Sequence, residues 1–319
     1  MIDFRYHLVS LIAVFLAVAL GIVIGTTALN NPISADIEAR VDQLEKDKRQ
    51  LEDRTQALTT QVDSADAFEQ AVAPALVDGT LADSGVLVVG TSDQVTPELV
   101  EQVGGLVTEA GATVTGVVRL QPQYSDPATE GALQSYVTGP GLPAGVQLPE
   151  SEDAGQLVGA LLAQTLMIPT GPGAREPESD DVSTVLAGLA ALDVLTVESS
   201  SVEPADYAVV LTGSGFEAED ASQRNETLVE LVSALDAGGG GAVVAGTAAS
   251  ARENGLVGTV RADPQLSAAI STVDNVDRAA GRISTVLALG QEAEGTSGQY
   301  GTGENTQPVP PVPDAVPAP

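Results

Sequence analysis

The sequence predicts a mixed α/β protein with one N-terminal transmembrane helix, a parallel coiled coil, an extracytoplasmic α/β domain with a mostly parallel sheet, and a disordered Pro-rich tail. Three observations predict this order. No charged side chain occurs between Leu8 and Leu29. Apolar residues then recur at every seventh position, and beyond residue 85 short aliphatic runs alternate with stretches of helical spacing.

The uncharged segment 8–29 predicts a membrane-spanning helix. It is 22 residues long, and about 20 apolar residues in a helix cross the hydrocarbon layer of a bilayer. Arg5 precedes it and acidic residues follow it, so the positive-inside rule places residues 1–7 in the cytoplasm and the bulk of the chain outside, in the cell envelope. A cleaved signal peptide is the alternative, but its apolar run is typically only about 7–15 residues long.

Small residues occur at a spacing of four within this segment, at Ala17, Gly21 and Gly25. They lie on one face of a helix, where small side chains let two membrane helices approach closely. We therefore expect this face to pair with a second helix. The alternative is that glycine is common in membrane helices for other reasons.

After an expected break at 30–32 (Asn-Asn-Pro), residues 36–73 show heptad spacing, which predicts a coiled coil that Pro74 ends. The predicted seam consists of Ile37, Val41, Leu44, Lys48, Leu51, Thr55, Leu58 and Val62. Polar residues within the seam favour a low oligomer number, so we expect a homodimer, although the mixed charges beside the seam also allow a different partner helix. A single helix lying on the protein's own domain is the other alternative, but its apolar face is usually broader.

Residues 74–84 are expected to form a linker and residues 85–292 one α/β domain. Strands are predicted at 86–89, 114–120, 207–211 and 242–245, and helices at 97–110, 129–137, 153–167, 182–192 and 221–235. Strands separated by helices are typical of βαβ units and a parallel sheet. Residues 293–319 are rich in glycine and then proline, which predicts a disordered tail.

Charge and cysteine content exclude several functions. From residue 55 onward, the sequence contains 36 acidic residues, 7 arginines and no lysine. Such a surface repels nucleic acids and anionic lipids. The chain has no cysteine and one histidine, His7, at the membrane boundary. The outer domain therefore has no thiolate nucleophile and no Ser-His pair, and we expect no enzymatic activity.

One glycine pattern suggests a cofactor site. Residues 213–218 match GxGxxA directly after a predicted strand, where a dinucleotide pyrophosphate could bind. However, Glu217, Glu219 and Asp220 would surround that phosphate with negative charge. Copper sites prefer sulfur and imidazole ligands, and the outer region offers only Met167, on an apolar helical stretch. We expect neither a cofactor nor a metal site.

Two segments resemble a known family. The opening MIDFRYHLVSLIAVFLAVALGIVIG and the late segment STVDNVDRAAGRISTVLALGQEAEGTSGQYG (271–301) are similar to the MctB family of actinobacterial envelope proteins named for copper transport. With the predicted coiled coil between them, the resemblance covers nearly the whole chain. It implies copper efflux or homeostasis, in mycobacteria through an outer-membrane channel. Members called SteB are instead linked to cell separation with a membrane partner, SteA, and affect peptidoglycan hydrolase activity.

The chain departs from what a copper carrier or pore should contain, so we expect a membrane-anchored protein that acts through contacts with a homodimer partner or a SteA-like protein. The polar part of the late segment consists of Asp274, Asn275, Asp277 and Arg282. It predicts a helix capped near Asp277, with residues 283, 286 and 287 on its buried face. A contact surface for a partner is the functional alternative.

Overall fold

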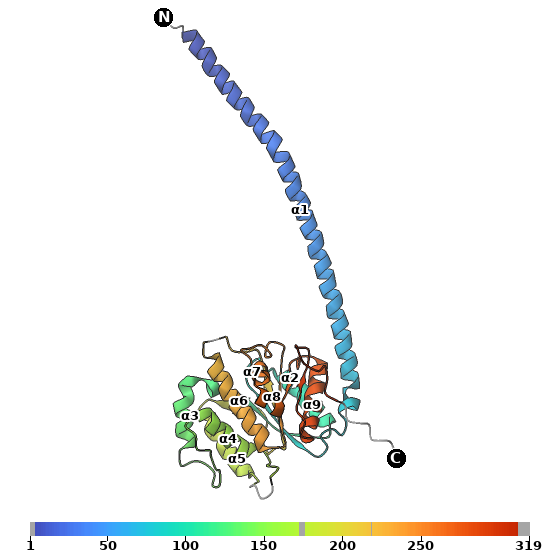
Figure 1. Ribbon diagram of the computed structural model, residues 1–319, viewed down its shortest axis with the longest axis vertical. Helices are drawn as coiled ribbons and strands as arrows, with labels where there is room; N and C mark the ends of the chain where they lie inside the picture. The colour runs from blue at the N-terminus through green and yellow to red at the C-terminus, as the bar shows by residue number, and fades with distance from the viewer. Residues whose placement is uncertain (1–3, 172–175, 218, 312–319) are drawn as a thin grey trace. The chain divides into compact units, whose positions relative to one another are not determined.

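The computed structural model describes residues 4–171, 176–217 and 219–311, without the side chains of residues 4, 26–36 and 38 (Figure 1). The chain divides into two compact units, residues 1–65 and residues 66–319.

A single helix, α1 (Phe4–Val77), makes up the described part of the first unit and continues into the second. The predicted N-terminal apolar helix is confirmed. The helix passes through residues 30–32 without the expected break, and it ends three residues beyond Pro74. Its last turns belong to the second unit, where Ala73 and Val77 are buried in an apolar core, and this burial accounts for the helix beyond the proline.

Seven strands form one sheet in the described residues of the second unit, in the order β3-β2-β1-β4-β5-β6-β7. The strands are β1 (Gly85–Gly90), β2 (Thr113–Leu120), β3 (Leu195–Val197), β4 (Tyr207–Thr212), β5 (Ala242–Gly246), β6 (Ser271–Val273) and β7 (Gln299–Tyr300). Every neighbouring pair is parallel except β2 and β3. The predicted mixed α/β fold with a mostly parallel sheet is therefore confirmed.

The helices of this unit lie in the connections between the strands. They are α2 (Pro97–Glu109), η1 (Pro122–Ser125), η2 (Pro127–Thr129), α3 (Glu130–Val137), α4 (Ala154–Leu166), α5 (Ser179–Ala190), α6 (Ala221–Gly238), α7 (Leu256–Ala262), α8 (Pro264–Ala269) and α9 (Ala279–Ala293). The five helices predicted between residues 97 and 235 correspond to α2, α3, α4, α5 and α6. Two short helices, α7 and α8, were not expected.

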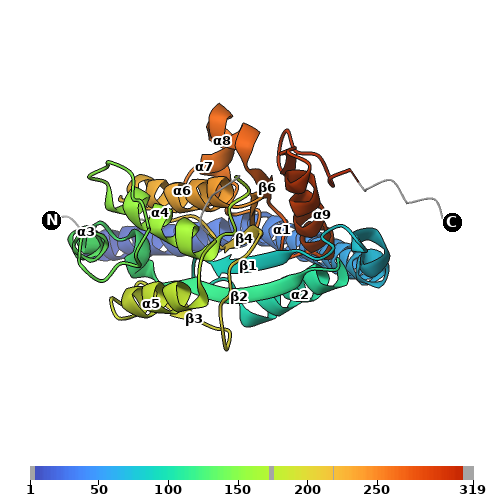
Figure 2. The ribbon, with the colours of Figure 1, turned by 90° about the horizontal axis from the view of Figure 1, so that it is seen from below.

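The central strands are buried on both faces, as their unbroken aliphatic sequences predict. On one face, Leu87 and Val89 pack with α4, α5 and α6. On the other face, Val86 and Val88 pack with α2, α9 and the end of α1. Figure 2 shows α4, α5 and α6 set apart from α2 and α9 across the strands. The sheet therefore separates two apolar cores.

The predicted helix in the late segment is confirmed as α9, and Ile283, Val286 and Leu287 lie on its buried face. Its first turn requires a glycine. A Cβ added to Gly281 would overlap the backbone carbonyl of Asn275. The glycine thus lets the start of α9 pack directly against the chain that leaves β6.

The structure differs from the prediction at the start of the tail. Residues 299–300 form β7 beside β6, and the backbone of Gln307 then hydrogen bonds with Gln299 and Gly301. Residues 299–307 are therefore part of the domain. The sequence did not predict β7, because a strand of two residues between glycines is too short to show a strand pattern. Residues 312–319 lie outside the described residues.

A buried carboxylate on α9 makes stability depend on pH. Glu292 is 7% exposed and its Oε1 accepts a hydrogen bond of 2.8 Å from the backbone N–H of Ser271. Burial raises the pKa of Glu292 from 4.5 to about 7. Its protonated form is thus favoured by folding, and this contribution to stability is present below pH 4.5 and lost as the pH rises through about 7.

We therefore expect the free energy of unfolding to fall between pH 5 and pH 8, and Glu292→Gln to flatten this dependence. Denaturant unfolding at a series of pH values measures it. Glu294→Gln, at an exposed position two residues on, is the matched control and should leave the slope unchanged. An equal slope in the wild type and Glu292→Gln would contradict the assignment.

Candidate functional site

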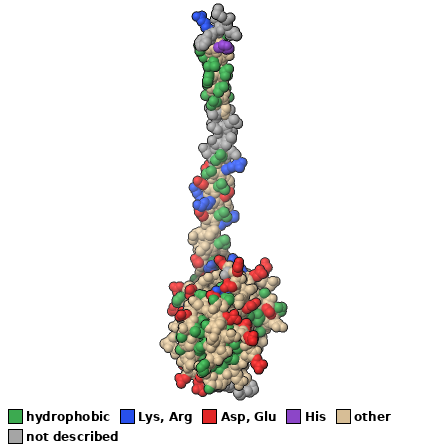
Figure 3. Space-filling view, turned by 90° about the vertical axis from the view of Figure 1, so that its left-hand side faces the viewer, with side chains coloured by type: hydrophobic (Ala, Val, Ile, Leu, Met, Phe, Trp, Pro, Cys, Tyr) green, Lys and Arg blue, Asp and Glu red, His purple; other side chains and the backbone are tan. Residues whose placement is uncertain are grey.

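The apolar part of α1 is the first functional element. Within the described residues, Arg5–Gly25 is the one helical stretch long and apolar enough to cross a membrane. Figure 3 shows apolar side chains gathered along it. Ala17 and Gly21 are exposed, and a Cβ added to Gly21 or Gly25 would meet nothing within 4 Å. The small-residue face is therefore open, and its pairing with a second helix stays a prediction.

The heptad seam is the second element. The described seam side chains are all on the surface of α1, and the largest among them are Leu44 at 67% exposed and Leu51 and Leu58 at 62% each. Lys48 lies 3.4 Å from Glu52, and the Thr55 hydroxyl donates to the Leu51 carbonyl at 2.8 Å. The polar seam residues are thus satisfied within one helix, while the leucines are not covered. The coiled coil stays a prediction.

The end of α1 departs from the predicted seam. Asp66 and Glu69, which fall within the predicted coiled coil, contact the amino end of α9 instead. The Glu69 carboxylate accepts from the N–H of Ala280 at 3.0 Å, and the Asp66 carboxylate accepts from Arg278 at 3.1 Å and from the N–H of Ala279 at 3.4 Å. The helix α9 is therefore capped by two carboxylates of α1, where the sequence predicted Asp277 or a neighbour.

The four residues suggested as a partner contact do not form one surface. Asp274 is 1% exposed, Asn275 7% and Arg282 6%, whereas Asp277 is exposed. Three of the four are thus inside the domain. This placement favours the structural alternative that the sequence left open, and a partner could reach only Asp277.

Asp274 holds the last part of the domain together. One carboxylate oxygen lies 2.7 Å from the Arg261 guanidinium, and the two oxygens accept from the N–H groups of Thr302 and Gly303 at 2.7 and 3.1 Å. Arg261 also donates to the Tyr300 carbonyl at 2.9 Å. This ion pair connects α7 with β6 and with the chain after β7.

The glycine pattern at 213–218 lies at the end of β4, beside β1, where the strand order reverses and doubly wound proteins bind ligands. Here the protein fills the position itself. The Gln94 side-chain oxygen accepts from the N–H of Ser214 at 2.6 Å, and a Cβ added to Gly213 would lie 2.7 Å from the Gln94 Cβ. The glycine at 213 thus admits the protein's own side chain. Residue 218 lies outside the described residues.

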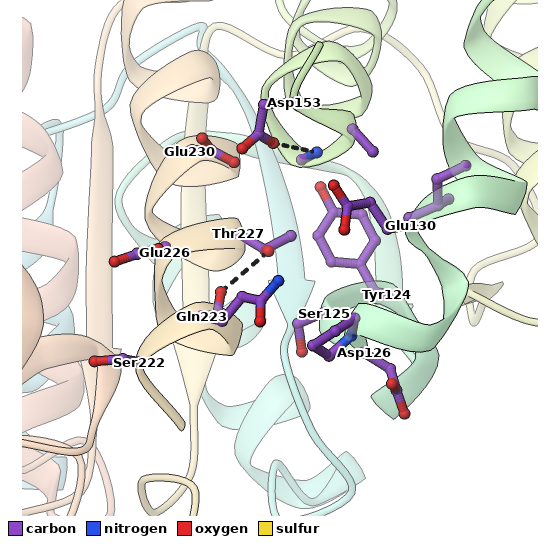
Figure 4. Close-up of a pocket in the computed structure, with 14 residues that line it drawn as sticks. Tyr124, Ser125, Asp126, Glu130, Asp153, Ser222, Gln223, Glu226, Thr227 and Glu230 are labelled. Carbon is purple, nitrogen blue, oxygen red and sulfur yellow. Dashed lines mark hydrogen bonds between the residues drawn. The ribbon is translucent and has the colours of Figure 1, made fainter. Parts of the chain in front are cut away.

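An acidic cavity lies between η1, α3, α4 and α6. Its volume is about 330 Å³ and its wall includes the carboxylates of Asp126, Glu130, Asp153, Glu226 and Glu230. Figure 4 shows Asp153 and Glu230 next to each other, near the ring of Tyr124. The sequence did not predict this cavity, because the residues that line it come from four elements that lie far apart in the sequence.

Electrostatics distinguish two carboxylates of the cavity. Burial, followed by the neighbouring Asp153, raises the pKa of Glu230 to about 7. A backbone hydrogen bond from Ala128 and the Arg224 guanidinium lower the pKa of Asp126. Asp126 is thus already satisfied, whereas no lysine or arginine joins Glu230 among the described residues of the cavity wall.

Few described side chains of the domain could coordinate copper. Among the described residues, no group of three His, Cys, Asp or Glu side chains is placed to hold a metal ion. The thioether of Met167 is 1% exposed and belongs to the apolar core beneath α4. The described part of the domain thus offers no preformed set of soft ligands.

One apolar helix of membrane-spanning length ahead of an α/β domain is the architecture of a single-anchor membrane protein. The family model described as "Copper transport outer membrane protein, MctB" matches residues 1–311. The chain belongs to the MctB family.

Mycobacterial relatives match the chain along nearly its whole length. The proteins named Copper transporter MctB from Mycobacterium tuberculosis and Mycobacterium bovis are each 33% identical over 312 residues, which is 97% of this chain and 99% of theirs. The protein of that name from Mycobacterium leprae is 33% identical over 315 residues, with the same coverage. The expected family is confirmed, and it places the chain among membrane-associated proteins of copper transport.

Proposed function

We propose that this chain is a single-pass envelope protein without enzymatic activity, which serves the copper function of its family through protein contacts. The segment Arg5–Gly25 anchors it in the membrane with the amino end in the cytoplasm. The heptad seam joins two copies in a homodimer, or joins one copy to a SteA-like membrane partner. The α/β domain lies outside the membrane and meets further partners.

The exposed seam is the observation that carries this proposal. Leucines at positions 44, 51 and 58 are each more than 60% exposed at heptad spacing on one helix. A narrow apolar stripe at this spacing is buried when a second helix packs against it, and its leucines would otherwise stay in water. A protein that assembles through α1 accounts for the stripe.

The donor atoms of the chain also support a role through contacts. Cu(I) prefers thiolate, thioether and imidazole ligands. The chain has no cysteine and one histidine, His7, beside the membrane segment. In the described part of the domain, Met167 is in the core and no group of carboxylates is placed to hold a metal ion. We therefore assign the movement of copper to the assembly rather than to a site in this domain.

Charge supports the proposed orientation. Arg5 lies at the amino end of the apolar segment, and the chain beyond residue 54 has a large excess of acid. A basic end is retained in the cytoplasm by the positive-inside rule. An acidic domain without disulfides stays soluble in the envelope by its charge and rests on the packing of its two cores.

Copper tolerance of a deletion strain tests the proposal. We expect the strain to grow poorly in copper and to recover with the wild-type gene. It should not recover with Leu44→Asp/Leu51→Asp, which breaks the seam. Gln43→Asp/Gln50→Asp adds the same charge one residue before each leucine, outside the seam, and should restore growth. Full recovery with the seam variant would contradict a role for assembly through α1.

Two further results would change the assignment. Tight binding at a defined stoichiometry in a titration of Cu(I) or Cu(II) into the full-length protein would contradict a role through contacts alone. A deletion strain with normal copper tolerance but unseparated cells would favour the cell-separation role instead. In that case, peptidoglycan hydrolase activity should also change in the strain.

A further inference from the structure

We propose that the acidic cavity between η1, α3, α4 and α6 is a binding site for a small organic cation, an aliphatic amine in its ammonium form. The proposal goes beyond the copper function and does not depend on it. The charge of the cavity, an unpartnered hydroxyl in its wall and its size each support this proposal.

The wall of the cavity carries negative charge without a positive side chain. It includes five acidic residues, and neither lysine nor arginine is among the residues that line it. Arg224 pairs with one carboxylate of the wall, Asp126, at 3.1 Å and with Asp220, which does not line the cavity, at 2.7 Å. Among the described residues that line the cavity, the other four carboxylates have no partner of opposite charge.

Asp153 and Glu230 are neighbouring carboxylates in this wall. Asp153 is fixed, because its carboxylate accepts from the N–H groups of Gly155 and Gln156 at 2.8 and 3.2 Å at the start of α4. Glu230 reaches it from α6, and the two side chains lie next to each other in Figure 4. Two neighbouring carboxylates repel each other unless they share a proton or hold a cation. An ammonium group between them would remove this repulsion.

The hydroxyl of Tyr124 is the second, independent observation. Tyr124 lines the cavity and is 1% exposed, and its hydroxyl has no hydrogen-bond partner among the described residues. Buried hydroxyls are nearly always satisfied, and one left without a partner is costly. Figure 4 shows the ring of Tyr124 among the residues that line the cavity, with Glu130 and Asp153 near it. An ammonium group could donate to this oxygen as well as to the carboxylates, since it has three donors.

Size and lining favour an amine over a metal ion. The cavity of about 330 Å³ is at the lower end of the range of about 300–1,000 Å³ for small-molecule sites. Leu133, Pro127 and Ala154 add apolar surface beside the carboxylates, which suits an aliphatic chain. No three carboxylates in the described residues are close enough to hold a metal ion. Ammonium binding requires no such fixed coordination, because its donors reach acceptors that lie further apart.

Calorimetric titration of the full-length protein in nanodiscs of phosphatidylcholine, a lipid without net charge, tests the site. The probes are 1,6-diaminohexane, the uncharged 1,6-hexanediol and Ca²⁺. We expect the diamine to bind saturably at one molecule per chain and the diol not to bind. No saturable binding of the diamine, or tighter binding of Ca²⁺ at the same site, would overturn the proposal.

Variants separate the site from the general acidity of the protein. Glu230→Gln should weaken diamine binding at least tenfold, and Tyr124→Phe should weaken it several-fold while the protein stays folded. Glu101→Gln removes the same charge from an exposed position on α2 and should change the affinity less than twofold. Equal losses for Glu230→Gln and Glu101→Gln would show diffuse attraction and overturn the site. If Glu230→Gln does not fold, Glu130→Gln on α3 tests the same site, and it should also weaken diamine binding.

Discussion

Replacement of Asp274 by alanine is expected to lower the free energy of unfolding of the α/β domain by about 3–5 kcal/mol, which is the usual cost of removing one partner of a buried ion pair. Asp274 is 1% exposed and Arg261 12%. Without the carboxylate, Arg261 keeps its bond to the Tyr300 carbonyl but loses its ion pair with Asp274. The N–H groups of Thr302 and Gly303 lose their acceptor.

The same variant should release the last part of the domain. Urea unfolding of the full-length protein measures the loss of stability, and amide hydrogen exchange at residues 299–307 measures the local release. Asp277→Ala is the matched control, because Asp277 lies three residues on and its side chain is 52% exposed. We expect it to change stability by less than about 0.5 kcal/mol. A loss below about 1 kcal/mol for Asp274→Ala would contradict the role assigned to this ion pair.

The second large effect is expected in the seam of α1. In the proposed dimer, Leu44→Asp/Leu51→Asp replaces four buried leucines with carboxylates. Each buried leucine contributes about 1.5–3 kcal/mol, and every 1.4 kcal/mol corresponds to roughly a tenfold change in affinity. The variant should therefore weaken association by roughly a thousandfold or more and give a monomer.

Molar mass in detergent, from light scattering corrected for bound detergent, measures this change. The domain of residues 66–319 has its own cores, so its thermal unfolding should be unchanged in the seam variant. Gln43→Asp/Gln50→Asp should keep the mass of the wild type. A wild-type protein that is already monomeric, or a seam variant that keeps the wild-type mass, would contradict the proposed assembly.

The sequence predicted the elements that have strong periodic signals. The strand at 86–89 is β1, one residue longer at each end, and the helix at 97–110 is α2, one residue shorter. A threonine cap at Thr96 and Pro97 at the first position mark the start of that helix. The local sequence is enough to determine a long aliphatic strand or a capped helix. The positions of such elements could therefore be predicted without the rest of the fold.

The elements that the sequence did not predict depend on distant partners. Strands β3, β6 and β7 have only two or three residues each, too few for a periodic pattern. The continuation of α1 beyond Pro74 depends on the burial of Val77, and the cap of α9 comes from α1, about 210 residues earlier in the chain. The acidic cavity likewise combines residues between 124 and 230. Tertiary contacts of this kind leave no local signal.

The short outer strands protect the domain from aggregation. An exposed sheet edge is a template on which another chain can add a strand. One edge here is β3, which is three residues long and antiparallel. The other is β7, which is two residues long and is followed by hydrogen bonds that connect Gln299 and Gly301 with the backbone of Gln307. Anchoring in a membrane would crowd many copies of this domain together. Neither edge offers a neighbouring copy enough free backbone to extend the sheet, so the domains can be crowded without polymerising.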